Sequence, residues 1–253
     1  GDMGGFCAAT YKRGIRFVNV PTTLLAAVDA NIGGKLGIDF MDFKNHIGLF
    51  KHPDAVFIDP IFFNTLPPRE LRSGFAEVMK HGLIADANYF ESTIKNGLQQ
   101  TDWKQCIETS LAIKQAVVNA DPEEHGLRKI LNFGHSIGHA IESHYLHKEN
   151  RLFHGEAIAI GMICEAYLSA KLLGMKKEYL NHISGAILNL FNDITIAKRD
   201  FTTLISLMHQ DKKNSTGVLN FSLLYEPGKA TYDIAVDEKD VMDALFYFNQ
   251  LNP

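Results

Sequence analysis

The chain has 253 residues, of which 46% are hydrophobic and 21% charged, with a formal net charge of −4 and a pI near 6.3. This composition allows one large domain or two smaller ones with a sizeable core, and the scattered basic residues form no continuous surface for nucleic acid. Three distant cysteines without CxxC spacing, no apolar run of roughly 18 residues and no N-terminal signal segment disfavour secreted, disulfide-rich and membrane proteins and favour the cytoplasm.

The first residues have the pattern of an α/β domain. Residues 1–6 resemble the end of a glycine-rich turn that leads into a helix, and a flexible tail is the alternative. Residues 15–20 and 55–59 are rich in β-prone side chains, and a proline follows each run. We therefore predict two strands at these positions.

A helix is predicted between these two strands. Thr22 and Thr23 can cap a helix over residues 24–31, and the glycines at 33–34 end it. Alternation of strand and helix predicts that residues 1–67 are the α/β part of the chain, a partial Rossmann-like domain.

Beyond the two prolines at 67–68, the apolar residues follow helical spacing. The predicted helices lie roughly at residues 69–85, 102–119, 136–147, 155–172 and 236–249. Residues 218–225 are instead β-prone and predict a strand. Residues 68–253 should thus form a mainly helical domain, and without a flexible hinge at the boundary the two parts should pack closely.

The richest chemical signal lies in residues 131–142. His135 and His139 are four residues apart, so on a helix they share a face, and Glu142 follows one turn later. Gly134 and Gly138 each cost about 1 kcal/mol of helix propensity relative to alanine. Close packing or a bound ligand would explain them.

Two further segments complete a candidate metal site. His154 opens an apolar helix, and Glu77 and Lys80 lie three residues apart on another helix. Two histidines and one glutamate can bind zinc and leave a position open for substrate. Spacing alone does not choose between His135 and His139, and for any single histidine a structural or surface role is the more common one.

Several basic residues lie beside glycines or polar turns, where their side chains can enter a cleft. These residues are Arg13, Lys35, Lys44, Lys80, Lys114, Arg128, Lys212 and Lys213. Cations of this kind suit phosphate and carboxylate groups. The alternative is that they are solvated surface residues.

Seven sequence blocks occur in a recognisable order along nearly the whole chain. They are GDMGGFCAATYKRG, VPTTLLAAVDANIGGKLGID, KNHIG, LPPRELRSGFAEVMKHG, GLRKILNFGHSIGHAIE, HGEAIAIGM and DKKNSTG. In this order the chain resembles the 3-dehydroquinate synthases. The resemblance implies an NAD- and metal-dependent enzyme that converts 3-deoxy-D-arabino-heptulosonate 7-phosphate to 3-dehydroquinate and phosphate, the second step of the shikimate pathway.

The resemblance also implies roles for individual residues. The metal ligands, for zinc or cobalt, fall on Glu77, His135 and His154. The substrate pocket is lined by Asp29, Lys35, Asn45, Lys80, Lys114, Arg128, Asn132 and His139, with Arg13 and either Lys212 or Lys213 near the phosphate. NAD contacts fall on Gly1, Asp2, Thr22, Thr23, Lys35, Lys44, Phe62 and Thr65.

The family pattern extends beyond this sequence. It has roughly a hundred further residues before Gly1, including the first strands of the NAD-binding domain, so we expect this chain to be part of a longer one. The family also suggests a homodimer. The rival hypotheses are another sugar phosphate cyclase of the valiolone or inosose type, a metal-dependent polyol dehydrogenase, and a non-catalytic helical scaffold.

Overall fold

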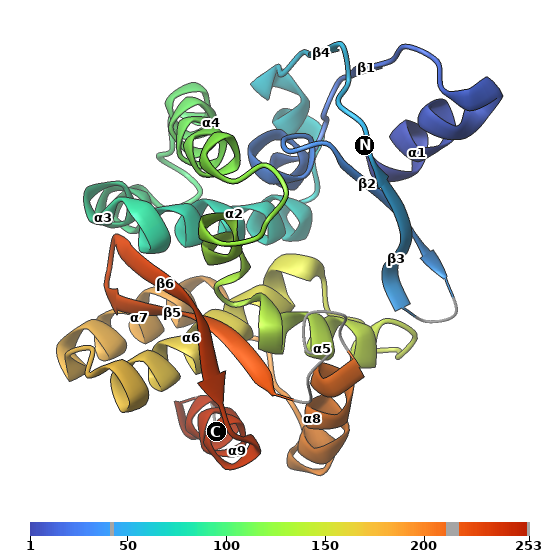
Figure 1. The fold of residues 1–253 in the computed structure, drawn as a ribbon. Helices are drawn as coiled ribbons and strands as arrows, with labels where there is room; N and C mark the ends of the chain where they lie inside the picture. The colour runs from blue at the N-terminus through green and yellow to red at the C-terminus, as the bar shows by residue number, and fades with distance from the viewer. Residues whose placement is uncertain (41–42, 211–217, 252–253) are drawn as a thin grey trace.

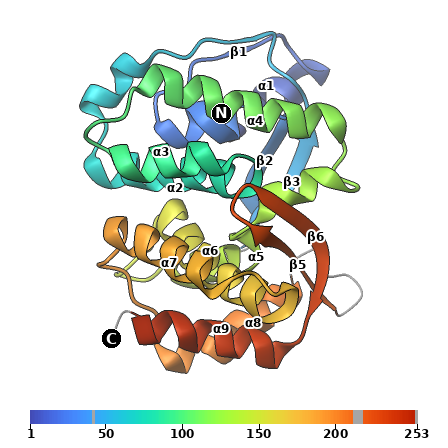
Figure 2. The same cartoon turned by 90° about the vertical axis from the view of Figure 1, so that its left-hand side faces the viewer.

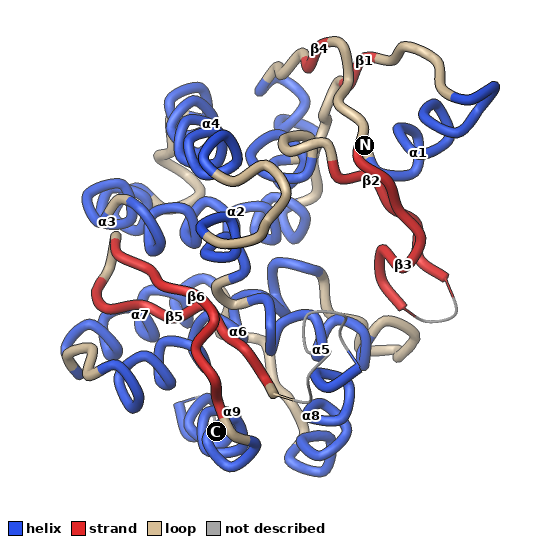
Figure 3. The backbone as a smooth tube through the Cα atoms, viewed as in Figure 1, coloured by secondary structure: helices blue, strands red, loops and turns tan. Residues whose placement is uncertain are grey.

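The computed structural model describes residues 1–40, 43–210 and 218–251. The ribbon divides into two halves that lie one above the other (Figures 1 and 2). The elements from α1 to α4 and β1 to β4 form one half, and those from α5 to α9 with β5 and β6 form the other. Helices dominate the described residues, and the strands among them form three separate two-stranded sheets (Figure 3).

The two strands predicted in the N-terminal part pair with each other, although each is shorter than expected. Helix α1 (Asp2–Thr10) and the 3-10 turn η1 (Tyr11–Arg13) lead to β1 (Val18–Asn19), which runs parallel to β4 (Ala55–Val56). Prolines confine the pairing, because Pro21 follows β1 closely and a proline can donate no ladder hydrogen bond.

The predicted helix over residues 24–31 is present, and most of it is the π-helix η2 (Ala26–Ala30). Thr23 caps it as expected, since its Oγ1 accepts a hydrogen bond of 3.2 Å from the backbone nitrogen of Ala26. A π-helix is rare and is frequently found at functional sites. In this chain it places Asp29 beside the side chains of Lys80 and Lys114.

An antiparallel hairpin follows that the sequence did not predict. Strand β2 (Lys35–Phe40) pairs with β3 (Phe43–Phe50), and Gly37 lies opposite Gly48. A Cβ at Gly48 would lie 2.6 Å from the carbonyl oxygen of Leu36, so the backbones approach closely there. Glycines and charged residues break the apolar alternation of both strands, which hides them from a pattern search.

The five helices predicted after residue 68 are all present. They are α2 (Pro68–Ala85), α4 (Trp103–Ala120), α5 (His135–Tyr145), α6 (His154–Leu173) and α9 (Glu238–Leu251). The remaining elements are α3 (Ala87–Asn96), η3 (Pro60–Thr65), η4 (Leu127–Asn132), α7 (Lys177–Leu190), η5 (Lys198–Asp200) and α8 (Phe201–Gln210). Among the helices in the described residues, none is long and apolar enough to cross a membrane.

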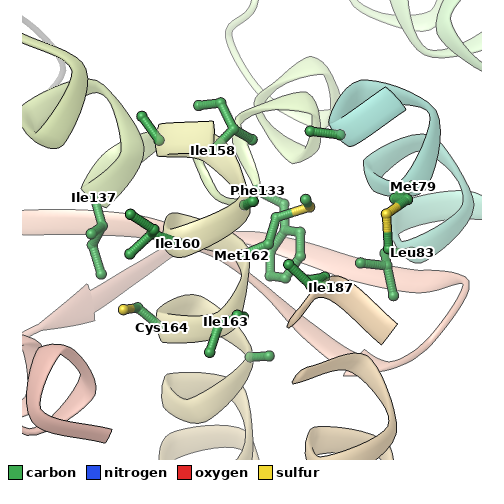
Figure 4. Packing of buried hydrophobic residues seen from close by; sticks show 14 of the residues in the cluster. Met79, Leu83, Phe133, Ile137, Ile158, Ile160, Met162, Ile163, Cys164 and Ile187 are labelled. Carbon is green, nitrogen blue, oxygen red and sulfur yellow. The ribbon is translucent and has the colours of Figure 1, made fainter. Parts of the chain in front are cut away.

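The predicted C-terminal strand is β5 (Leu219–Glu226), and it forms an antiparallel hairpin with β6 (Lys229–Val236). One side of β5 packs on α6, the most buried helix of the fold. Figure 4 shows Ile160, Met162 and Ile163 of α6 among apolar side chains of α2, α5 and α7. Removing this apolar surface from water is the main term that holds these helices together.

Glycines allow α5 and α6 to approach at backbone distance. A Cβ at Gly161 would overlap the carbonyl oxygen of Gly134, and one at Gly138 would lie 3.1 Å from the carbonyl oxygen of Ala157. Gly134 also has a positive φ of 81°, which glycine adopts without strain. The helix-propensity cost noted for Gly134 and Gly138 is therefore explained by packing between the two helices that carry the histidines.

Candidate metal centre and anion pocket

Three side chains from three helices meet in the predicted metal site. Glu77 lies on α2, His135 is the first residue of α5, and His154 is the first residue of α6. Their ligand atoms all lie within 4.8 Å of one another. Nε2 of His135 and Nε2 of His154 are 3.3 Å and 3.1 Å from the same oxygen, Oε1 of Glu77. The geometry and donor types fit a single divalent ion.

Glu77 is fully buried and ionised. Burial opposes ionisation, but the charge of Lys80 outweighs it and holds the pKa of the Glu77 carboxyl well below its usual value. Burial in turn lowers the pKa of His135, which keeps its imidazole neutral at physiological pH. A carboxylate and neutral imidazoles are the protonation states in which these groups bind metal.

A cluster of charged groups adjoins the metal site. Lys80 contacts Glu77, and its Nζ is 3.7 Å from Oδ1 of Asp29. Nζ of Lys114, on α4, is 2.9 Å from the same oxygen. Burial works against the charge of Lys80, but Glu77 and Asp29 outweigh it and raise the Lys80 pKa, whereas burial lowers the pKa of Lys114. The structure thus brings together three residues that the family resemblance placed in the substrate pocket.

His81 joins this cluster and was not predicted. Its side chain is fully buried, and its Nε2 lies 3.4 Å from Oδ1 of Asp29, near but outside hydrogen-bond geometry. Burial lowers its pKa, so the ring is neutral. The sequence offered no signal for this role. Asp29 is distant from Lys80 and His81 in the sequence, and only the position of η2 brings it beside both.

A second group of predicted pocket residues gathers around Glu124. Lys35 of β2 forms an ion pair with Glu124, and Nδ2 of Asn132 donates a 2.7 Å hydrogen bond to Oε1 of the same carboxylate. Glu124 has a positive φ of 63°, unusual for a residue with a side chain. The sequence did not predict a role for Glu124, because the acidic segment around it has the composition of an exposed turn. Gly126, two residues later, was the available signal for a constrained turn.

Arg128 is almost completely buried and bonds to backbone carbonyls. Its Nη1 donates to the carbonyl oxygen of Pro122 at 2.5 Å, and its Nη2 donates to that of Gly33 at 3.3 Å. The oxygens of Asp121 accept bonds from the backbone of the turn that holds it. Arg128 thereby ties the segment before β2 to η4, and its retained charge suits recognition of an anion.

The other predicted site residues are more dispersed. His139 is one turn beyond His135, with the two ring centres 5.0 Å apart. Arg13 has an exposed side chain in η1. Lys44 and Asn45 lie in β3 with side chains outside the described part, and Lys212 and Lys213 lie outside it altogether. The residues predicted to contact NAD are in the N-terminal half: Gly1, Asp2, Thr22, Thr23, Lys35, Phe62 and Thr65.

A network of charges fixes the start of α6, where His154 lies. Glu156 accepts hydrogen bonds from Arg69 at 2.7 Å to each of its two oxygens and from Arg72 at 3.0 Å. Its Oε2 also accepts a 2.8 Å bond from the backbone nitrogen of Phe153. The arginines come from α2, the helix of Glu77, so this network fixes the position of Glu77 relative to His154.

This network predicts a pH dependence of stability. Burial raises the pKa of Glu156, but Arg69 and the Phe153 backbone outweigh it, so the folded pKa is lower than the unfolded one. The stabilisation is then present above the unfolded pKa and lost as the pH falls through the folded pKa. We expect Glu156→Gln to lower the free energy of unfolding at pH 7 and to flatten its decline in acid. Urea titrations over a pH series, with the exposed Glu149→Gln as control, measure both.

Comparison with known proteins identifies the family. The profile of the 3-dehydroquinate synthase N-terminal domain matches residues 1–73, and that of the C-terminal domain matches residues 74–214. The chain is 41% identical to the 3-dehydroquinate synthase of Parabacteroides distasonis, over 98% of this chain and 71% of that one. It is 43% identical to that of Dictyoglomus thermophilum, over 97% and 70%. The chain belongs to the 3-dehydroquinate synthase family.

Solved structures agree with this membership. The 2-epi-5-epi-valiolone synthase of Streptomyces hygroscopicus, with NAD+ and Zn2+ bound, superposes with a TM-score of 0.88 at 26% identity, over 99% of this chain and 71% of that one. A 2-deoxy-scyllo-inosose synthase with carbaglucose-6-phosphate, NAD+ and Co2+ gives 0.84 at 28%, over 97% and 70%. The predicted fold class and the prediction of an enzyme of this family are thereby confirmed.

The dehydrogenase rival shares the fold alone. A probable glycerol dehydrogenase of Sinorhizobium meliloti has a TM-score of 0.54 at 15% identity, over 96% of this chain and 72% of that one. At that identity the likeness carries no information on activity.

Proposed function

We propose that the protein converts 3-deoxy-D-arabino-heptulosonate 7-phosphate to 3-dehydroquinate and phosphate, as the second step of the shikimate pathway. The observation that carries the proposal is the convergence of Glu77, His135 and His154 close to the buried cations Lys80 and Lys114. Valiolone and inosose synthases share this fold, and the higher identity to 3-dehydroquinate synthases, 41% against 26% and 28%, favours this substrate.

In this proposal Glu77, His135 and His154 hold one zinc or cobalt ion, and the N-terminal half contributes to an NAD site. The donor set supports the metal, since one carboxylate and two imidazole nitrogens converge, with Glu77 and His135 buried and His154 half-buried. When bound, the ion would supply polarisation of a substrate hydroxyl, and NAD would supply reversible hydride transfer. The division into an NAD-binding part at 1–67 and a metal- and substrate-binding part at 68–253 belongs to the same proposal.

The chain's own residues act mainly by binding and orienting the substrate. Lys80, Lys114 and Arg128 are buried cations that can hold carboxylate and phosphate groups in place of water. Fixed charges in a dry pocket act more strongly than the same charges in water, and they need no reorganisation during the reaction. Phosphate elimination and ring closure depend on orientation, which such a pocket provides.

The proposal predicts phosphate release without net NADH. With 3-deoxy-D-arabino-heptulosonate 7-phosphate, NAD and zinc or cobalt, the full chain should release one phosphate for each 3-dehydroquinate formed, while absorbance at 340 nm stays flat. The substrates of the valiolone and inosose synthases should turn over far more slowly. Preference for either of those would refute the substrate assignment, and steady NADH accumulation would instead indicate a polyol dehydrogenase.

Three further expectations accompany this function: a small-molecule sugar acid phosphate as the partner of the site, a cytoplasmic location and a homodimer. Sedimentation equilibrium of the purified protein tests the last of these directly.

A further inference from the structure

The two candidate histidine ligands are held in the same way. Nδ1 of His135 is 3.1 Å from the carbonyl oxygen of Phe133, while its Nε2 faces Oε1 of Glu77 at 3.3 Å. A carbonyl oxygen can only accept a hydrogen bond, so Nδ1 carries the proton. With Nδ1 protonated, Nε2 is the nitrogen of the neutral ring that would bind an ion held beside Glu77.

His154 repeats this arrangement with a side chain in place of the carbonyl. Its Nδ1 is 3.0 Å from Oε2 of Glu142, and its Nε2 is 3.1 Å from Oε1 of Glu77. A carboxylate oxygen accepts hydrogen bonds, so when Nε2 binds an ion, the protonated Nδ1 of His154 can donate to Glu142. Both histidines therefore present Nε2 toward the same oxygen of Glu77.

Glu142 is itself a potential ligand, because His139, Glu142 and His154 form a second group whose ligand atoms lie within 4.8 Å of one another. The two groups share His154. In the Glu77 group, two imidazole nitrogens lie within 3.3 Å of a single carboxylate oxygen. The orientation of His135, which Phe133 fixes independently, favours this group.

We propose that Glu142 is a positioning residue that sets the tautomer and ring orientation of His154, so that Nε2 binds the metal. The proposal rests on the metal site of the proposed function. A hydrogen-bonded carboxylate behind a metal-binding histidine also raises the basicity of the ring. Because Glu142 lies on α5 two turns after His135, one helix supplies a ligand and orients the other ligand on α6.

Metal affinity tests this role without reference to turnover. The apparent dissociation constants for zinc and cobalt are measured by competition with a chromophoric chelator. Loss of an outer partner typically weakens metal binding about 10- to 100-fold. We expect that loss in Glu142→Ala and in Glu142→Met, which fills more of the volume. Glu142→Gln should retain most of the affinity, because its amide oxygen can still accept the Nδ1 proton. The exposed Glu149→Ala is the matched control.

Each outcome has a separate meaning. If the wild-type protein binds neither metal, the proposed metal site fails. If it binds and both the alanine and methionine variants bind equally well, the positioning role of Glu142 is refuted. If Glu142→Gln binds as weakly as Glu142→Ala, and the visible spectrum of the cobalt form changes in both, then Glu142 is a ligand and the inference is overturned.

Discussion

Glu77→Gln is expected to lower kcat by a factor on the order of a thousand or more and to abolish tight metal binding. An ion that polarises a substrate oxygen contributes several kcal/mol of transition-state stabilisation, and each 1.36 kcal/mol corresponds to tenfold in rate. Glutamine keeps the size of the side chain but removes the charge toward which both histidines point. Steady-state assays and elemental analysis of the purified variant measure the two effects.

The same substitution should also destabilise the fold. Glu77 contacts Lys80, whose side chain is almost completely buried. Removing one partner of a buried ion pair typically costs about 3 to 5 kcal/mol, and Asp29 at 3.7 Å offsets part of that loss. Thermal unfolding of the metal-free proteins isolates this effect from metal binding.

Two controls make the result decisive. Glu123→Gln removes the same charge from an exposed side chain, and it should leave activity, metal content and Tm unchanged. His135→Ala should abolish turnover while leaving the contact between Glu77 and Lys80 intact. Wild-type turnover by a folded Glu77→Gln protein, or by metal-stripped wild-type protein, would exclude the metal assignment.

Five of the helices could be predicted because their signals are local. Apolar residues at helical spacing gave α2, α4, α5, α6 and α9 to within a few residues. The β2 to β3 hairpin was missed, since its strands are held by backbone pairing across glycines and expose much of their side-chain surface. No apolar periodicity marks strands of that kind.

The candidate site shows a different limit. The sequence placed His135 and His139 on one face of a helix but could not choose between them, because spacing does not encode what lies opposite. The choice depends on Glu77, which is 58 residues away in sequence from His135 and meets it only because α2 and α5 both pack against α6. Glu142 was noticed as part of the same face, yet its contact with His154 depends on the approach of two helices.

The close contact between α5 and α6 predicts that one added methyl group has a large effect on stability. Gly161→Ala should lower the free energy of unfolding by about 3 kcal/mol, at the upper end of the usual cost of overpacking a core. The added Cβ would overlap the carbonyl oxygen of Gly134 and lie 2.9 Å from the backbone nitrogen of Gly138. Backbone cannot turn aside as a flexible side chain can, so α5 must shift away from α6. Urea unfolding measures the loss.

Gly185→Ala is the matched control, and it should change stability in the opposite direction. Gly185 is an exposed residue within α7, and a Cβ there meets no atom within 4 Å among the described residues. Alanine should stabilise the helix by about 0.5 to 1 kcal/mol. Because α5 carries His135 and α6 carries His154, Gly161→Ala should also weaken zinc binding, whereas Gly185→Ala should not. Equal stability and zinc affinity in the two variants would show that contact between these helices does not set the geometry of the site.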